Sequence, residues 1–155
     1  MVILRIKMKS LIPLIFFFIC SNLYAYQPKL MLLGSLENKG ESFIDVNAHQ
    51  KIRDSFKQAV IYEKYANPIK DEQGATYQSV IKQLIVDCTG KTIAIRGADY
   101  FAGKTSNSKL VKKFDDITLS HDGETGAAFY SFDDLEFKAL NQDKFYKKIY
   151  ANTCK

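Results

Sequence analysis

The side chains best suited to chemistry in this 155-residue sequence are few and widely separated. His49 and His121 are the two histidines, and neither has a Cys, His or acidic residue at the helical or strand spacing of a metal site. We interpret both as solvated loop histidines and predict no metal ligands. Adjacent carboxylates occur at Asp71/Glu72, Asp115/Asp116 and Asp133/Asp134. On a strand, two adjacent carboxylates point to opposite faces and cannot act together on one substrate. We therefore interpret these pairs as turn or surface residues.

Catalytic motifs are missing from the sequence. It contains no G-x-S-x-G, no phosphate-binding loop and no H-E-x-x-H. We therefore predict a non-enzymatic protein without a cofactor. A small hydrolase is the alternative, because catalytic carboxylates come from separated segments; it would require acidic residues with raised pKa values in a cleft.

The first 25 residues predict export. Arg5, Lys7 and Lys9 precede the ten-residue apolar run Leu11–Cys20, and Ala25 provides a small residue at the cleavage site. This is the pattern of a signal peptide, residues 1–25, that is cleaved before Tyr26. The run is shorter than the roughly 20 residues that a membrane-spanning helix needs.

Lipidation of Cys20 is not expected, because Ile19 stands where a bacterial lipobox has a small residue. Two cysteines then remain in the mature chain, Cys88 and Cys154. An even number of cysteines in an exported chain predicts a disulfide, whose 66-residue loop is worth about 4 kcal/mol in the chain-entropy model. A reactive thiol pair would show C-x-x-C spacing, which is absent.

Charge and composition exclude several classes of protein. The net charge of +5 falls to +2 without residues 1–25, which hold three basic residues and no acidic one. A near-neutral exported chain with scattered basic residues argues against nucleic-acid binding. The hydrophobic fraction of 46% and the charged fraction of 25% exclude a disordered tail and a polytopic membrane protein.

Short strands are predicted along the first half of the mature chain, at residues 29–35, 41–46 and 56–65. Asn67-Pro68 is expected to end the third strand, before a polar turn at residues 70–75. The clearest element is a hairpin over Tyr77–Phe101. Its first strand presents one face with four core residues and one exception, Lys82; the four are Val80, Leu84, Val86 and Cys88.

A two-residue turn at Thr89-Gly90, with Gly90 at positive φ, sets the register of this hairpin. It pairs Val86 with Ile93 and Leu84 with Ile95, and apolar residues therefore face apolar residues. Continued without interruption, the same register pairs Gln83 with Arg96 and Lys82 with Gly97.

The C-terminal third is predicted as a strand over residues 110–119, a loop over 121–128 and a final helix. Residues 129–140 fit either a helix that begins at Ser131 with Asp134 or a strand. Asn141 is expected to cap the last helix, whose apolar stripe consists of Phe145, Tyr146, Ile149, Tyr150 and Cys154. The fold class is therefore α+β: one domain, residues 26–155, with a meandering antiparallel sheet, a C-terminal helix packed on one face and one disulfide.

Tyrosine and lysine together suggest a binding surface, because tyrosine offers apolar area and a polar tip. The mature chain has eight tyrosines, and we expect most of them to pack at the edges of the core. Lys144, Lys147 and Lys148 form a basic helix face that could meet an acidic polysaccharide or lipid, although solvation is the commoner explanation.

The order of these features resembles the bacterial surface-adhesin protein E family. The resemblance begins at Leu33-Gly34 and Phe43-Ile44-Asp45 and covers almost all of the mature chain. Its most specific parts are Tyr77-Gln-Ser79 ahead of Asp87-Cys88, and a second cysteine, Cys154, near the end. Two features depart from the family: the lipobox is absent, and Phe137 lies where members often have Trp.

The resemblance implies a small sheet-and-helix domain in the periplasm or on the cell surface. Some members bind host proteins such as vitronectin and laminin, can dimerise, and use the hairpin around the first cysteine. Carried to this chain, the contacts are Lys82, Lys91, Arg96 and Tyr100. We therefore expect an adhesin-like protein that binds a host matrix or plasma protein. The alternative is a periplasmic accessory or inhibitor protein that binds an envelope partner.

Overall fold

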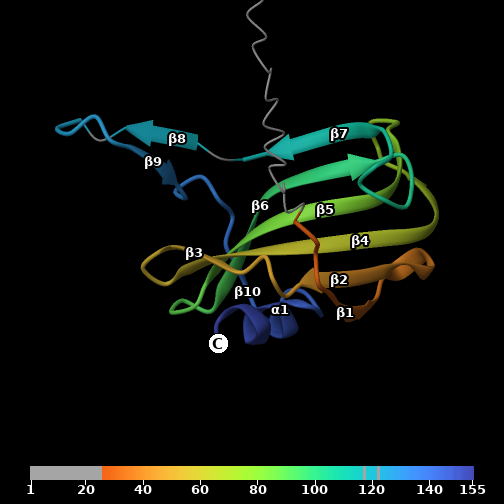
Figure 1. Ribbon diagram of the computed structural model, residues 1–155, viewed down its shortest axis with the longest axis horizontal. Coiled ribbons are helices and arrows are strands. Elements are labelled where there is room, and N and C mark those ends of the chain that lie inside the picture. Colours follow the sequence, from red (N-terminus) through yellow and green to blue (C-terminus); the bar gives the residue numbers. More distant parts are fainter. Residues whose placement is uncertain (1–25, 117, 122) are drawn as a thin grey trace, which may run out of the picture.

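One large antiparallel sheet dominates the described part of the chain (Figure 1). The computed structural model describes residues 26–116, 118–121 and 123–155. The expected signal peptide, with Cys20, lies outside these residues. In chain order the elements are β1 (Leu30–Ser35), η1 (Glu37–Lys39), β2 (Glu41–Asp45), β3 (Gln50–Arg53), β4 (Phe56–Lys70), β5 (Thr76–Asp87), β6 (Thr92–Phe101), β7 (Leu110–Asp115), β8 (Thr118–His121), β9 (Ala128–Ser131), β10 (Lys138–Ala139) and α1 (Tyr146–Thr153).

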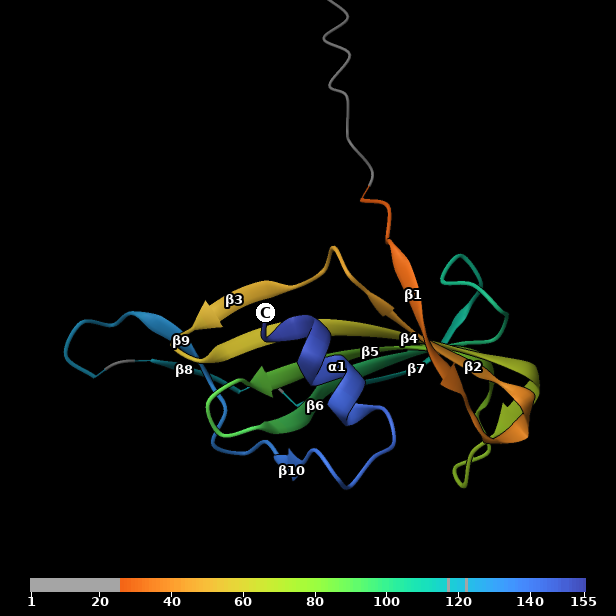
Figure 2. The ribbon, with the colours of Figure 1, turned by 90° about the horizontal axis from the view of Figure 1, so that it is seen from below.

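Eight strands form the main sheet, in which β1, β2, β4, β5, β6 and β10 are neighbours in that order. β3 pairs with the beginning of β4, and β7 pairs with the later part of β6. β8 and β9 form a separate two-stranded hairpin that projects beyond the end of the main sheet (Figures 1 and 2). The predicted strand at residues 110–119 is therefore two strands, because β7 ends at Asp115 and β8 begins a different sheet.

α1 covers one face of the sheet, and the main core lies between them (Figure 2). The expected apolar stripe is confirmed, since its five residues all belong to this cluster or pack against it. Their partners on the strands are Leu33, Ile44, Ala59, Ile61, Leu84, Val86 and Ile93. We call this surface of the sheet the α1 face.

The opposite face of the sheet is buried as well, at the end near the β5–β6 turn. Ile85 and Ala94 form a second cluster with Phe132 and Leu135, which lie in the segment after β9. The Phe56 ring packs against Phe132 in a tilted arrangement, with ring centroids 5.2 Å apart. No helix begins at Ser131, and the strand alternative for residues 129–140 holds only at its ends, in β9 and β10; the Ser131 hydroxyl donates to Asp133 Oδ2 and accepts the Asp133 N–H in a local turn.

The register of the β5–β6 hairpin is confirmed near its turn, where Val86 pairs with Ile93 and Leu84 with Ile95. Farther from the turn, the predicted pairing partners on β6 are wrong by one residue. A β-bulge after Ile95 pairs Gln83 with Gly97 and Lys82 with Ala98. An alternating pattern does not reveal such an insertion, because a bulge adds one residue to one strand only.

Lys91, not Gly90, has positive φ in the hairpin turn, with a value of 54°. Gly90 is required for another reason. A Cβ at this position would overlap the carboxylate of Asp87, which accepts hydrogen bonds from the turn and from Ser55. Gly90 is therefore needed to leave space for the Asp87 carboxylate, and not because the backbone adopts a conformation that only glycine tolerates.

β4 continues past Pro68, contrary to the expectation that Asn67-Pro68 ends it. The pairing with β5 is interrupted between Lys64 and Ile69 and then resumes. Proline is tolerated at such an irregularity because it removes no ladder hydrogen bond there. The polar turn at residues 70–75 is confirmed, with Asp71 accepting the backbone N–H groups of Gln73 and Ala75.

The last helix begins at Tyr146, so the prediction of Asn141 as its cap is wrong. Asp143 has the nearest equivalent role, because its Oδ1 accepts the N–H of Phe145 at 2.7 Å.

The Cys88–Cys154 disulfide is confirmed, with 5.5 Å between the Cα atoms. One eight-residue α-helix occurs in the described residues, so the fold is mainly sheet rather than an even α+β mixture. No described helix is long and apolar enough to span a membrane.

Candidate functional site

A groove runs along the α1 face, beside and partly beneath the start of α1. It consists of two hollows of about 330 and 350 Å³ and a narrow cavity of about 50 Å³ that shares residues with both. Lys82 lines all three. We call the larger spaces the η1 hollow, beside Glu37 and Asn38, and the β7 hollow, beside Phe114; the cavity between them is the waist.

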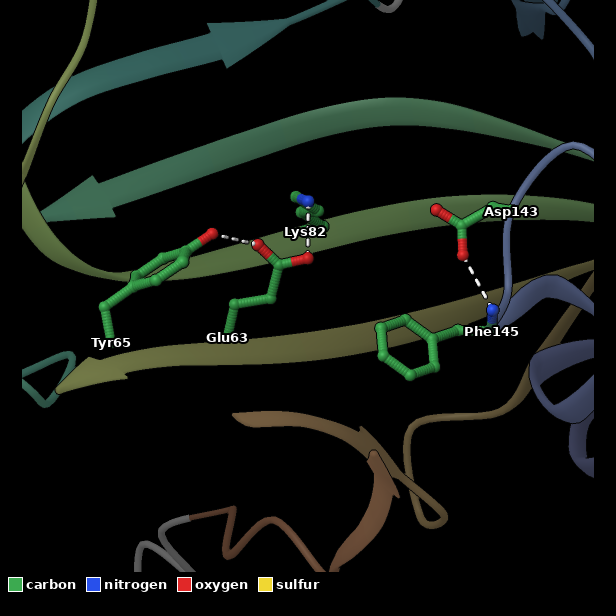
Figure 3. Close-up of polar contacts among 5 residues, drawn as sticks. All are labelled: Glu63, Tyr65, Lys82, Asp143 and Phe145. Carbon is green, nitrogen blue, oxygen red and sulfur yellow. Dashed lines mark hydrogen bonds and ion pairs between the residues drawn. The ribbon is translucent and has the colours of Figure 1, made fainter. Parts of the chain in front are cut away.

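Glu63 and Lys82 form an ion pair at the centre of the groove (Figure 3). Glu63 lies on β4 and Lys82 on β5, in diagonal positions of the same face, because Glu63 pairs with Val80 and Ile61 with Lys82. The Lys82 Nζ atom lies 2.5 Å from Glu63 Oε1, and the Tyr65 hydroxyl donates to Oε2 at 2.8 Å. Both oxygens of the buried Glu63 carboxylate therefore have partners, as a buried charge requires.

Tyrosines extend this network along the sheet. Burial, followed by the nearby Glu63 carboxylate, raises the pKa of Tyr65 well above its ordinary value. The Tyr77 ring contacts both Tyr65 and Tyr100 edge to face, with centroids 5.9 and 4.9 Å apart. Lys112 lies over the Tyr100 ring and pairs with Asp71 at 2.8 Å. These aromatic and ionic contacts join β4, β5, β6, β7 and the β4–β5 turn, and they hold the groove-lining residues Tyr65 and Tyr100 in place.

The waist contains one buried polar group whose hydrogen-bonding capacity is not used. Ser42 is 1% exposed, and its Oγ has no hydrogen-bond partner among the described residues. Asp143, an exposed residue, also lines the waist; its Oδ1 accepts the N–H of Phe145, and Figure 3 shows its other oxygen turned toward the Glu63–Lys82 pair. The remaining walls are aliphatic or aromatic and come from Ile61, Leu84, Ile95, Phe145, Tyr146 and Ile149.

The β7 hollow is open and partly apolar. Ile95 and Phe114, both of which line it, are 37% and 43% exposed. Phe114 is on β7 and pairs with Ala98 of β6. A Cβ on the adjacent Gly97 would lie 3.0 Å from the Phe114 carbonyl oxygen, so the glycine permits the close approach of β7. Lys138 and Glu136 form an ion pair at the rim of the hollow.

The structure separates the four binding residues that the family resemblance suggested. Lys82 and Tyr100 meet in the β7 hollow. Lys91 lies in the turn at the other end of the hairpin, next to Cys88, and Arg96 lies at the bulge. Neither of these two residues is among those that line the groove.

Sequence reasoning missed Glu63, the ion-pair partner of Lys82. The signal was present, because Glu63 interrupts the alternating apolar face Ala59, Ile61 and Tyr65 of β4 in the same way that Lys82 interrupts its own strand. Opposite charges that each interrupt an apolar face favour cross-strand pairing. Ser42, Asp143 and Phe114 had no comparable signal, because only the fold brings Ser42 and Asp143 together in the waist and Phe114 into the β7 hollow.

The described residues contain no group of three or more His, Cys, Asp or Glu side chains that could hold a metal ion. His49 lies in the loop between β2 and β3 as expected, but its Nε2 atom is buried, so the expectation of a solvated side chain is wrong for this residue. His121 is the last residue of β8, so the expectation that it lies in a loop is wrong; its side chain is outside the described part of the structure. Lys144 and Lys148 donate to the carbonyls of Ser35 and Leu33, which gives two lysines of the basic helix face a structural role.

Comparison with known proteins places this sheet in a family. The model of the surface-adhesin protein E family matches residues 31–132, from β1 through the whole β5–β6 hairpin to the segment after β9. No curated protein and no solved structure matches the chain. The match includes Cys88 and most of the groove, and it covers more than half of the 155 residues. The chain therefore belongs to the surface-adhesin protein E family.

Proposed function

We propose that this protein is an exported, non-enzymatic adhesin that binds a host extracellular-matrix or plasma protein, of the kind represented by vitronectin and laminin. Family membership supports adhesion as the general function. The predicted signal peptide, residues 1–25, supports export. The Glu63 carboxylate, with both oxygens bonded to Tyr65 and Lys82, is poorly placed to act as a catalytic base.

The binding surface in this proposal is the groove, whose floor is provided by β4, β5 and β6. One observation carries the assignment: Ile95 and Phe114 remain substantially exposed inside a hollow of about 350 Å³. Large apolar side chains gathered in a polar-rimmed depression are typical of protein interaction sites. Tyr100 and Lys82 line the same hollow, and tyrosine is common at the centres of such interfaces.

Two matched substitutions on β7 test this assignment. Phe114→Ser removes apolar area inside the groove, whereas Leu110→Ser removes a residue that is 47% exposed on the same strand but does not line the groove. We expect Phe114→Ser to weaken binding to immobilised vitronectin or laminin by about tenfold, the effect of roughly 1.4 kcal/mol. Leu110→Ser is expected to bind as the wild type does. Equal binding by both variants and the wild type contradicts the groove as the interface.

A Lys91→Ala/Arg96→Ala variant tests the two candidate contacts outside the groove. If this double variant loses binding and Phe114→Ser retains it, the interface is the hairpin turn and bulge rather than the groove. Circular dichroism and thermal unfolding of each variant distinguish lost contacts from lost folding.

A periplasmic accessory or inhibitor protein is the second candidate. The observation that favours it is Ile19 before Cys20, which departs from the lipobox that anchors adhesins of this family. Protease treatment of intact cells separates the two functions. Degradation of the protein supports surface display, whereas full protection with release on outer-membrane lysis supports the periplasmic function.

A further inference from the structure

We infer that the waist of the groove is a binding site for a primary ammonium group, such as the end of a lysine side chain on the bound partner. The inference deepens the proposed function and rests on it for the identity of the partner as a protein. It rests on three properties of the waist: an unpaired buried hydroxyl, an excess of carboxylate and apolar walls around a small volume.

The unpaired hydroxyl is Ser42 Oγ. It is almost completely buried, lines the waist and has no partner among the described residues. Leaving a buried polar group without a hydrogen bond is unfavourable, so nearly all such groups in folded proteins are satisfied by protein, water or ligand. Ser42 therefore indicates that the waist accommodates a polar group.

The charges of the lining residues indicate that this polar group is a cation. Glu63 and Asp143 line the waist with two carboxylates, whereas Lys82 is the one cation among its lining residues. Lys82 is already bonded to Glu63, and the second oxygen of Asp143 is turned toward this pair (Figure 3). One added cation balances the charge, and its N–H donors match the Asp143 carboxylate and Ser42 Oγ as acceptors.

Size and wall composition favour a primary ammonium over a guanidinium. The waist has a volume of only about 50 Å³. An ammonium is a compact charge with one heavy atom, whereas a guanidinium is a plane of four. The apolar stem of a lysine can lie against Phe145, Tyr146 and Ile95, since long charged side chains bury their stems while the charged end finds polar partners.

The probe for this site is n-butylammonium, which is a lysine side chain without its backbone. Titration into the isotope-labelled full chain, followed by NMR, should give saturable shifts at the amides of Ser42, Glu63 and Asp143. n-Butanol is the neutral control and n-butylguanidinium the larger cation, all at constant ionic strength. We expect n-butylammonium to bind about tenfold more tightly than either control, because it alone forms the charged hydrogen bonds within the available volume.

Two variants of equal charge locate the site. Asp143→Asn removes the charge but retains an oxygen for the Phe145 N–H, so the start of α1 is preserved. Asp115→Asn removes the same charge from β7 outside the lining of the groove. Asp143→Asn should weaken n-butylammonium binding about tenfold, and Asp115→Asn should leave it unchanged. Ser42→Ala should also weaken binding without lowering the unfolding temperature.

Several outcomes would overturn the inference: shifts that do not saturate, equal binding of n-butanol or tighter binding of n-butylguanidinium, or equal effects of Asp143→Asn and Asp115→Asn. A crystal soaked with n-butylammonium that holds only water in the waist would overturn it too.

The adhesion assay tests the proposed function independently of the ammonium site. If Phe114→Ser abolishes matrix binding while n-butylammonium does not bind, the proposed function stands and the ammonium site fails; the reverse result supports the site and removes the proposed partner.

Discussion

Asp45 shows how one buried side chain organises the start of the described chain. The residue is fully buried, and its Oδ1 accepts the backbone N–H groups of Lys29 and Asn47. Its Oδ2 accepts the hydroxyl of Tyr26 at 2.5 Å. Desolvation of the Tyr26 hydroxyl and this hydrogen bond raise the pKa of Tyr26 to about 12. Residues next to the predicted cleavage site are therefore tied to the sheet through one carboxylate.

His49 makes the stability of the protein depend on pH. Burial lowers its pKa from the ordinary value of 6.5, with Lys57 and Lys155 contributing in the same direction and Asp45 opposing them. The folded state therefore binds the proton less readily than the unfolded state does. The contribution of His49 to stability is complete above pH 6.5 and decreases as the pH falls from 6.5 toward the lowered pKa.

We predict that His49→Gln reduces this loss of stability in acid. Urea unfolding of the wild type and the variant at pH 7.5 and pH 5 measures the effect. The difference in unfolding free energy between the two pH values should be smaller for the variant, because glutamine does not titrate. The same pH dependence in both proteins would show that other groups are responsible.

At the scale of elements, α1 depends on its attachments rather than on its own helical stability. The helix has eight residues and no side-chain hydrogen bond at its N-cap. Isolated helices of this length are marginal in water. α1 is joined to the β5–β6 turn by the disulfide and by the Tyr150 hydroxyl, which donates to the Cys88 carbonyl at 2.8 Å. Lys148 and Lys144 bind carbonyls of β1, which also protects part of this edge strand.

Loss of the disulfide should therefore weaken the whole domain and release the helix first. We predict that Cys88→Ala/Cys154→Ala lowers the unfolding free energy by about 4 kcal/mol, from the entropy of a 66-residue loop. Urea unfolding measures the loss, and hydrogen exchange should show faster exchange at Ile149 than at Ile85. The reduced wild type is the control and should match the variant. Unchanged stability would show that packing alone holds α1.

At the scale of the whole molecule, the sheet has two buried faces near the hairpin turn. Leu84 belongs to the cluster beneath α1, and its neighbour Ile85 belongs to the cluster beneath the segment after β9. The two residues are 2% and 0% exposed. Successive residues of a strand point to opposite faces, so this pair reports on both layers.

Leu84→Ala and Ile85→Ala should be comparably destabilising, each by about 2–5 kcal/mol. A sheet with one solvated face would instead show a large effect only for Leu84→Ala. Urea unfolding of both variants provides the comparison, and Leu110→Ala, at a site that is 47% exposed, serves as a control with little expected effect. A small effect for Ile85→Ala would contradict a second buried layer.

Local chemistry accounts for what could be predicted. The alternation of β5 and β6 gave the correct register near the turn, because apolar residues must face one side there. The stripe from Phe145 to Cys154 predicted which side of α1 is buried, and it placed Cys154 within reach of Cys88. Family membership was also recognisable from the residues, and the family model confirms it.

The errors occurred where distant segments change the local outcome. Pro68 does not end β4, because the pairing with β5 resumes beyond it. The bulge after Ile95 lies against β7: the β7 backbone is close to Gly97, and the N–H of Asp116, just after β7, donates to the Arg96 carbonyl at 2.8 Å. Asn141 does not cap α1, since the helix starts where its packing on the sheet begins.

By itself, the sequence determined the strands around the hairpin, the apolar side of the last helix, the disulfide and the family, because each depends on local periodicity or on residue type. The groove is visible only in the tertiary structure. In the sequence Lys82 is one charged residue in an apolar pattern, whereas in the fold it lies among Glu63, Tyr65 and Asp143. The physical reason is that a buried charge must find its partners across strands and loops, and only the fold determines which ones lie within reach.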